Sequence, residues 1–143
     1  MKKEKSCGAV VYKYIDNELY ILLLKHNKGH YSFSKGHVEG NETEEETAIR
    51  EIKEETNLDV ILDTGFRFVN TYSPKKDVIK DVIYFVGMPI NDDIVKQDKE
   101  VADINWYGVE DAFEVITHDD DKEVLRKACE YITYEKKDNK SNL

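Results

Sequence analysis

Three glutamates fall at a spacing that would crowd their carboxylates on one face of a helix. Residues 50–55 read REIKEE, which places Glu51, Glu54 and Glu55 in the spacing RExxEE. At about 100° per residue, Glu51 and Glu55 project close together and Glu54 lies about 60° to one side. Carboxylates crowded in this way remain solvated, shift their pKa values upward or share a cation. Hard divalent cations with oxygen ligands, Mg²⁺ first, suit such a cluster.

Spacing alone leaves a second explanation open, because acidic runs on helices are usually solvated faces. Glu42, Glu45 and Glu46 are explained in that way, since acids in a first turn complement the helix dipole. Glu44 falls on the same face as the three glutamates, two turns earlier. The choice between a solvated face and a metal site therefore depends on the residues around the glutamates.

Those surrounding residues follow a longer pattern. Residues 36–58 read GHVEGNETEEETAIREIKEETNL and fit G-x5-E-x7-R-E-U-x-E-E-x-G-U at eight of nine defined positions, where U is bulky and aliphatic. This segment resembles the Nudix box, the signature of the Nudix hydrolase family. Asn57 stands where the family has glycine. That position follows the helix end, where left-handed backbone is common and Asn is the next most tolerant residue.

The composition predicts one soluble globular domain. The chain has 143 residues, of which 40% are hydrophobic and 36% charged, enough to bury a core. We predict a single domain over residues 1–138 and a disordered tail over 139–143. No apolar run is long enough to cross a membrane. The apolar stretch over residues 7–12 is too short to form the hydrophobic region of a signal peptide. Cys7 and Cys129 lie in no motif, which predicts a reduced, cytoplasmic protein with both cysteines in the core.

The charge distribution bears on the partners. A net charge of −9 argues against a general nucleic-acid binder. A polyphosphate could approach so acidic a protein only with the help of cations, either divalent metal on the glutamates or local basic residues. Two basic groups are present, the first with Lys25, His26, Lys28, His30, Lys35 and His37, and the second with Lys75, Lys76 and Lys80. For most of these residues, ordinary surface charge is the commoner explanation.

The elements that must position these residues follow from hydrophobic periodicity and turn signals. The pattern predicts an antiparallel hairpin over 6–14 and 18–24, strands over 60–70, 78–87 and 101–107, and helices over 43–56, 109–115 and 120–135. Thr43 and Glu46 form a candidate capping box for the first helix, with Asn41 as the rival cap. Pattern alone indicates an α/β or α+β fold. The Nudix resemblance implies an α/β/α sandwich with a mixed β-sheet.

Within the family, the chain is more similar to the asymmetrical diadenosine tetraphosphate hydrolases. Residues 18–26, ELYILLLKH, look like the second strand of that group. Residues 30–39, HYSFSKGHVE, resemble its H-W-x-x-P-K-G-H-V-E, and residues 80–85, KDVIYF, resemble K-T-V-I-Y-W. Glu100 precedes WYGVEDA as a glutamate precedes W-L-G-L-E-E-A in that group. Three departures are Ser34 for proline, Tyr31 for tryptophan and a different loop over 70–80.

The resemblance implies a metal-dependent reaction on phosphorus. Glu51, Glu54 and Glu55 are expected to bind Mg²⁺ or Mn²⁺, with the Gly36 carbonyl as a further ligand. Glu100, from a separate loop, completes the metal site or acts as the base. The metals neutralise phosphate oxygens while water attacks phosphorus in line.

The substrate contacts are expected from residues before and after the box. Lys35 is the cation nearest to the Nudix box and is expected to hold the substrate phosphates. His37 is expected either to assist Lys35 or to make a structural hydrogen bond. The other expected contacts are His30, Tyr72, Lys80 and Tyr84, of which the two tyrosines are candidates to stack on a base. For Tyr84, burial in the core is as strong an expectation as stacking on a base. For Trp106, burial in the core is preferred over contact with the substrate. Arg50 is expected to pair with carboxylates such as Glu42.

The expected activity is hydrolysis of a small nucleotide, diadenosine tetraphosphate, to ATP and AMP. The alternatives are a nucleoside triphosphate pyrophosphohydrolase and an enzyme that trims RNA 5′ ends, although the negative charge argues mildly against long RNA. A non-catalytic Nudix-fold nucleotide sensor is disfavoured because such proteins usually lose box glutamates. A calcium-binding module is disfavoured because the chain has no Asp-rich loop with EF-hand spacing.

Overall fold

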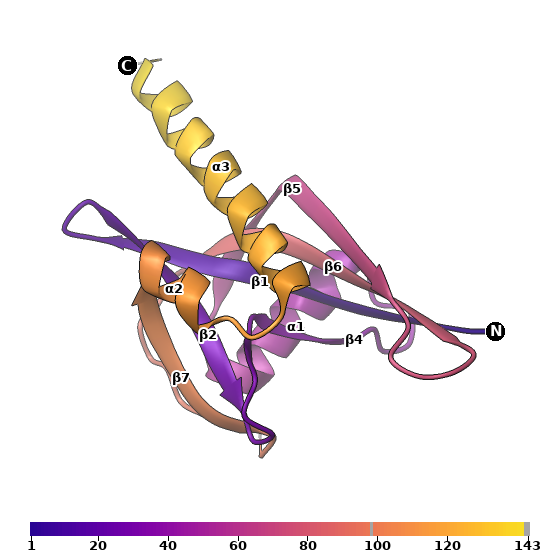
Figure 1. Cartoon of the computed structure of the whole chain (residues 1–143). Helices are drawn as coiled ribbons and strands as arrows, with labels where there is room; N and C mark the ends of the chain where they lie inside the picture. Colours follow the sequence, from indigo (N-terminus) through magenta and orange to yellow (C-terminus); the bar gives the residue numbers. More distant parts are fainter. Residues whose placement is uncertain (98, 142–143) are drawn as a thin grey trace.

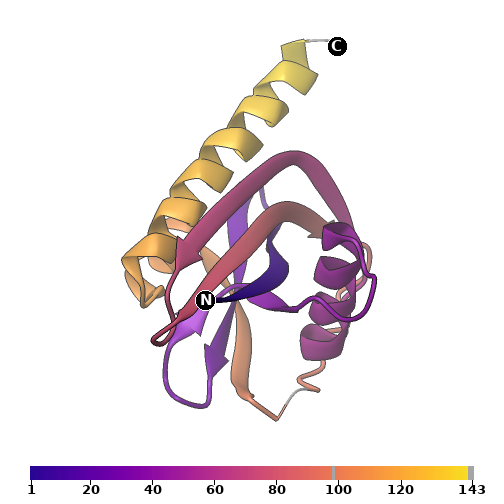
Figure 2. The same ribbon diagram turned by 90° about the vertical axis from the view of Figure 1, so that its right-hand side faces the viewer.

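The computed structural model describes residues 1–97 and 99–141 as a mixed β-sheet between helices (Figure 1). The elements are β1 (Lys2–Ile15), β2 (Glu18–His26), β3 (Tyr31–Ser32), β4 (Ser34–His37), α1 (Glu44–Thr56), β5 (Val60–Tyr72), β6 (Val78–Pro89), β7 (Val101–Gly108), α2 (Val109–Val115) and α3 (Asp119–Ser141). Figure 2 shows α1 on one side of the sheet and α3 on the other. The predicted α/β/α sandwich with a mixed sheet is confirmed.

The strand β1 joins the parts of the sheet. It pairs in parallel with β6 from Lys2 to Val11, and antiparallel with β4 over residues 6–9 and with β2 over residues 12–15. The predicted hairpin between β1 and β2 turns at Asp16 and Asn17, whose φ angles are 50° and 67°. Two left-handed residues suit a two-residue hairpin turn. The strand begins at Lys2 rather than at residue 6 because its pairing with β6 extends to that end.

Alternation along the strands divides the core into two clusters, because successive side chains of a strand point to opposite faces. Val10, Leu23 and Tyr84 pack under α3, while their neighbours Ala9 and Leu22 pack under α1. The predicted core face of α3 is confirmed, with Val124, Leu125, Ala128 and Ile132 buried and Cys129 half-buried. Cys7 is buried in the other cluster, and both cysteines are free thiols.

The helix α1 has the caps that its sequence predicts. Thr43 Oγ1 accepts a hydrogen bond from the Glu46 backbone N–H at 3.1 Å, and the Thr43 N–H donates to Glu46 Oε1 at 2.9 Å. This capping box excludes Asn41 as the cap. At the other end, Asn57 has φ 69° and ψ 4°. Its side-chain amide donates to the Asp93 carbonyl at 2.9 Å, which also fixes the following loop. The expected left-handed conformation is therefore confirmed.

Asn57→Gly should leave the free energy of unfolding nearly unchanged, because glycine adopts positive φ easily but loses the hydrogen bond to Asp93. Asn57→Val should lower it by roughly 1 kcal/mol or more, because a β-branched residue resists the left-handed region. Urea denaturation of the three proteins measures both effects. If Asn57→Val and the wild type had equal denaturation midpoints and slopes, the left-handed backbone at residue 57 would impose no free-energy penalty on a β-branched residue.

The helix α3 runs from Asp119 to Ser141, beyond the predicted end at residue 135. Residues 135–141 contain neither Gly nor Pro and are rich in Lys, so no strong breaker stops the helix. The part of the expected disordered tail up to Ser141 is thus helical, and residues 142–143 lie outside the described residues. Among the described helices, none combines the length and apolar character needed to cross a membrane.

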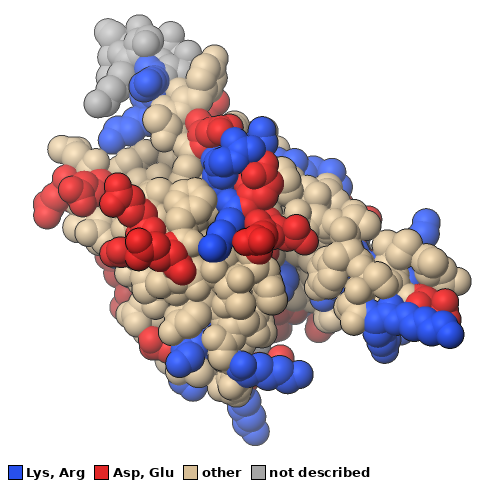
Figure 3. Space-filling view, viewed as in Figure 1, with Lys and Arg blue, Asp and Glu red and all other residues tan. Residues whose placement is uncertain are grey.

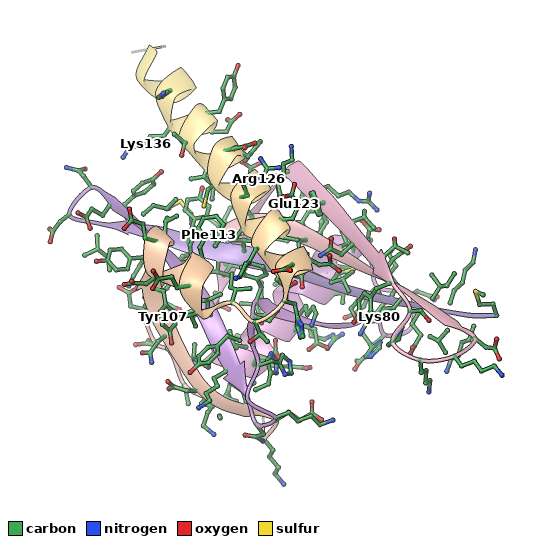
Figure 4. All side chains as sticks on the ribbon, viewed as in Figure 1. Lys80, Tyr107, Phe113, Glu123, Arg126 and Lys136 are labelled. Atoms are coloured by element: carbon green, nitrogen blue, oxygen red, sulfur yellow. The ribbon has the colours of Figure 1, made fainter. Side chains whose placement is uncertain are left out.

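The surface of α3 explains how so charged a helix is accommodated. Arg126 pairs with Glu123, three residues earlier, at 2.6 Å (both are labelled in Figure 4). It also pairs with Glu130, four residues later, at 2.7 Å. Acidic side chains gather over α2 and α3 on the face seen in Figure 3, and Lys and Arg are interspersed among those of α3. Such exposed pairs contribute little stability individually. The apolar face of α3 therefore holds the helix on the sheet.

Candidate active site

Gly36 in β4 lies directly against the carboxylate of Glu51 in α1. A Cβ atom built at Gly36 would lie 2.0 Å from Glu51 Cδ and 2.2 and 2.4 Å from its two oxygens. Only glycine allows the backbone of β4 to approach so closely. Burial raises the pKa of Glu51, while the Arg50 guanidinium, 2.8 Å away, acts in the opposite direction. The predicted ligands Gly36 and Glu51 are thus brought into contact.

Glu55 is the most enclosed of the three box glutamates, with 5% of its surface exposed. Its Oε1 accepts hydrogen bonds from Ser34 Oγ at 2.5 Å and from the Lys35 backbone N–H at 3.1 Å. Ser34 stands where the related pattern has proline, which could make no such bond. In this chain, therefore, β4 fixes the rotamer of Glu55 through a serine hydroxyl.

Arg50 holds the acidic side chains together. It makes two hydrogen bonds to Glu42, at 2.6 and 2.9 Å, as the sequence predicts. It also donates to Glu51 at 2.8 Å, to Glu54 at 3.2 Å and to the His37 carbonyl at 2.9 Å. The hydrogen bonds from Arg50 to Glu42, and then the bond from the Glu39 backbone N–H, lower the pKa of Glu42 to about 2. Arg50 therefore positions carboxylates and the end of β4.

A cavity of about 640 Å³ beside α1 brings most of the predicted residues together. We call it the glutamate cavity. Its lining includes the predicted metal-site residues Gly36, Glu51, Glu55 and Glu100, and the predicted substrate contacts His30, Lys35, His37 and Lys80. Glu100 comes from the loop before β7, where its carbonyl accepts the Asn27 backbone N–H at 2.9 Å. Carboxylates and cations from four separate segments thus face one space.

The basic side of this cavity is formed by two lysines from different strands. Lys35 lies in β4 and Lys80 in β6, and Figure 4 labels Lys80 at its place on the sheet. Burial lowers the pKa of Lys80, and the positive charge of Lys35 lowers it further. Two neighbouring ammonium groups that destabilise each other favour a bound anion between them.

Glu54 and Glu44, which share the face of α1 with Glu51 and Glu55, do not line the cavity. Glu54 is 56% exposed and pairs with Arg50, and it lines a separate shallow hollow with Lys53, Asn57 and Gln97. Glu44, two turns earlier, accepts hydrogen bonds from Nε and Nη2 of Arg67 at 2.8 and 2.9 Å and pairs with Lys5. These partners, Arg67 first, lower the pKa of Glu44 to about 2. Glu44 therefore fastens α1 to the sheet.

A second cavity of about 430 Å³ lies beside the start of α3. We call it the tyrosine cavity. It is lined by His30, Ser32, Lys35, Asn70, Tyr72, Val82, Tyr84, His118, Asp119, Asp120 and Asp121. His30 and Lys35 line both cavities, so the two spaces adjoin. Sequence reasoning missed Ser32, His118 and Asp121, because no motif marks them and they meet only when α3 packs beside β3.

The two tyrosines of this cavity have different environments. Tyr72 is 40% exposed, so its ring is accessible from solvent. Tyr84 is fully buried, and its ring packs edge-on against Phe33 with centroids 5.4 Å apart. Tyr84 is therefore a core residue that also lines the cavity. Trp106 is partly buried, packs against the core under α1 and carries the Lys13 ammonium 4.4 Å above its ring.

Comparison with known proteins decides the family. The NUDIX domain model matches residues 6–128 of the chain. The chain belongs to the Nudix family. The asymmetrical bis(5′-nucleosyl)-tetraphosphatase of Rattus norvegicus is 28% identical over 140 residues, which cover 90% of this chain and 95% of that protein. That of Caenorhabditis elegans is 29% identical over 133 residues, which cover 90% and 96%.

A solved structure agrees with these relatives. The crystal structure of a C. elegans Ap4A hydrolase binary complex superposes with a TM-score of 0.83 at 28% identity, covering 91% of this Nudix chain and 98% of that one. The resemblance inferred from residues 36–58 is thus confirmed. This Nudix protein is an enzyme that hydrolyses pyrophosphate bonds of nucleoside polyphosphates.

Proposed function

We propose that this Nudix hydrolase cleaves diadenosine tetraphosphate to ATP and AMP with the help of Mg²⁺ or Mn²⁺. The observation that carries the proposal is the junction of the two cavities at His30 and Lys35. On one side lie carboxylates and lysines suited to phosphates and cations, and on the other lies an accessible tyrosine suited to a nucleobase. The names of the relatives at 28% and 29% identity support the same substrate.

The donor atoms of the glutamate cavity fit a hard divalent cation. Glu51, Glu55 and Glu100 offer carboxylate oxygens there, and the backbone of Gly36 touches Glu51. Among the described residues, no three acidic, His or Cys side chains form a preassembled cluster. Mg²⁺ is usually held by one or two carboxylates together with substrate phosphates and water, rather than by a full protein cage. Partial ligation by this cavity therefore suits Mg²⁺ or Mn²⁺ that arrives with the polyphosphate.

The residues of the chain then have distinct tasks. A cation bound at Glu51 and Glu55 would neutralise phosphate oxygens and make the attacking water more acidic. Lys35 and Lys80 hold the phosphate chain by charge. Glu100, exposed on its loop, takes the proton of the attacking water or completes the cation site. In this scheme Tyr72 stacks on one adenine.

Glu54 differs from Glu51 and Glu55 because it lies outside the glutamate cavity. Its spacing in the box predicts a metal ligand, whereas its carboxylate is paired with Arg50 at 3.2 Å outside the cavity. Because the side chain is 56% exposed, a change of rotamer would release it from Arg50 at small cost. We propose that Glu54 joins the cation site in this way when the polyphosphate binds.

Purified protein with Mg²⁺ should convert diadenosine tetraphosphate into equal amounts of ATP and AMP, and a chelator should abolish the reaction. Chromatography of the products measures this, with nucleoside triphosphates, ADP-ribose and triphosphorylated RNA as competing substrates. Hydrolysis in ¹⁸O-labelled water shows which phosphorus is attacked. Two ADP products would mean symmetrical cleavage. Rapid triphosphate or RNA-end cleavage without dinucleotide cleavage would move the assignment to those substrates.

A further inference from the structure

Asp121 is a buried carboxylate in the tyrosine cavity that the proposed reaction does not use. It lies in the first turn of α3 and is 9% exposed, whereas its neighbours Asp119 and Asp120 are exposed. Ser32 Oγ in β3 donates a hydrogen bond to Asp121 Oδ2 at 3.0 Å. A buried charged group is costly unless it has partners. One hydroxyl from Ser32 uses a small part of what a carboxylate can accept.

Asp121 lies between the two ends of the nucleotide site. The Lys35 ammonium, at the junction with the glutamate cavity, opposes the rise in the Asp121 pKa that burial causes. On the other side, the pKa of Tyr72 is raised by burial and then by the charge of Asp121. The carboxylate is thus near both the cation expected to hold phosphate and the ring expected to stack on the base.

The order of groups in a nucleotide places its sugar at this point. With phosphates at Lys35 and the base at Tyr72, the ribose lies opposite Asp121. A ribose presents two neighbouring hydroxyl donors, and a carboxylate accepts both, as in other nucleotide sites. The Watson–Crick edge of adenine instead presents one donor beside one acceptor, and the acceptor would face the carboxylate unfavourably. The sugar is therefore the better match.

The hydroxyl of Tyr84 adds a second buried polar group beside Asp121. Tyr84 lines the same cavity, and its hydroxyl is buried without a hydrogen bond from any described residue. Ser32 and Asp121 are close enough to the hydroxyl to act on the pKa of Tyr84, although neither contact meets the distance and angle of a full hydrogen bond. Buried polar groups are nearly always paired in a complete site. A ligand hydroxyl can both donate and accept a hydrogen bond. It therefore suits a position between the Asp121 carboxylate, which accepts, and the Tyr84 hydroxyl.

We propose that Asp121 accepts hydrogen bonds from the ribose hydroxyls of the bound nucleotide and makes the enzyme selective for ribonucleotides over 2′-deoxyribonucleotides. This inference rests on the proposed nucleotide function and adds a specificity-determining residue to it. It predicts discrimination at the sugar that does not depend on the base.

The test compares diadenosine tetraphosphate with its bis-2′-deoxy analogue. The wild type should show a kcat/KM about tenfold or more higher for the ribose form, mostly through KM, which is the factor expected for one hydrogen bond to a charged group. Asp121→Asn keeps the shape and can still accept from Ser32. It should reduce this preference about fivefold, because hydrogen bonds to neutral groups contribute less. Asp111→Asn removes the same charge from an exposed residue of α2 that lines neither cavity, and it should keep the preference.

Binding of AMP and 2′-dAMP to the wild type, measured by calorimetry, tests the inference without catalysis and without a variant. Tighter binding of AMP supports the role of Asp121 even if diadenosine tetraphosphate is not cleaved, in which case only the proposed substrate fails. Equal binding of both, beside normal cleavage, overturns the ribose contact alone. If Asp121→Asn changed the preference between guanine and adenine nucleotides but not the preference for ribose, Asp121 would contact the base. That result would also overturn the proposed ribose contact.

Discussion

Glu55→Gln should lower kcat/KM by at least about 10²-fold, equivalent to about 2.7 kcal/mol of transition-state stabilisation. The glutamine carbonyl can still accept the hydrogen bonds that Ser34 and Lys35 now donate to Glu55 Oε1. The fold of β4 against α1 should therefore survive. The variant loses the negative charge that the cavity would offer to a divalent cation, and that charge is the property under test.

The measurement is kcat/KM over a range of Mg²⁺ concentrations, with thermal unfolding as the check on structure. Glu45→Gln serves as the matched control, because Glu45 is exposed in the first turn of the same helix. It should keep the wild-type rate. A near-normal rate for Glu55→Gln with an intact fold would refute the cation assignment. A loss of similar size in Glu54→Gln would show that Glu54 leaves Arg50 during the reaction, while an unchanged rate would restrict the site to Glu51 and Glu55.

The helix α1 shows what a sequence can predict reliably. Its capping box at Thr43 and its left-handed end at Asn57 depend on residues within a few positions of each other. Local interactions of this kind are encoded directly in the spacing of residue types. The predicted pairing of Arg50 with Glu42 has the same character, because both residues lie in one short segment. The loop and helix of the box could therefore be predicted in detail.

The partners of individual glutamates could not be predicted in that way. Helical spacing gives the direction of a side chain around the helix axis, but not which strand faces it. Glu44 lies on the expected face and yet binds Arg67, a residue of β5 that is 23 positions away. Asp121 and Ser32 are 89 positions apart and meet only in the folded chain. The tyrosine cavity is built from such distant contacts, which explains why Ser32, His118 and Asp121 could not be predicted as part of its lining.

Gly36→Ala should reduce kcat/KM by at least about 10²-fold, as misplacement of a reacting group by about 1 Å can do. The added methyl would lie within 2.4 Å of both oxygens of the Glu51 carboxylate. The side chain of Glu51 is flexible at that end, so it should move away and leave the fold intact. The variant therefore removes Glu51 from the cavity without changing any charge, which separates its position from its charge.

Gly108→Ala provides the control, because a Cβ at Gly108 would meet nothing within 4 Å. It should match the wild type in both rate and stability. For Gly36→Ala, denaturation should show a small loss of stability beside the large loss of rate. Glu51→Gln, which keeps the position and removes the charge, completes the comparison. If Gly36→Ala were fully active while Glu51→Gln was inactive, the charge of Glu51 would matter but its contact with β4 would not, and Gly36 would have no part in the cation site.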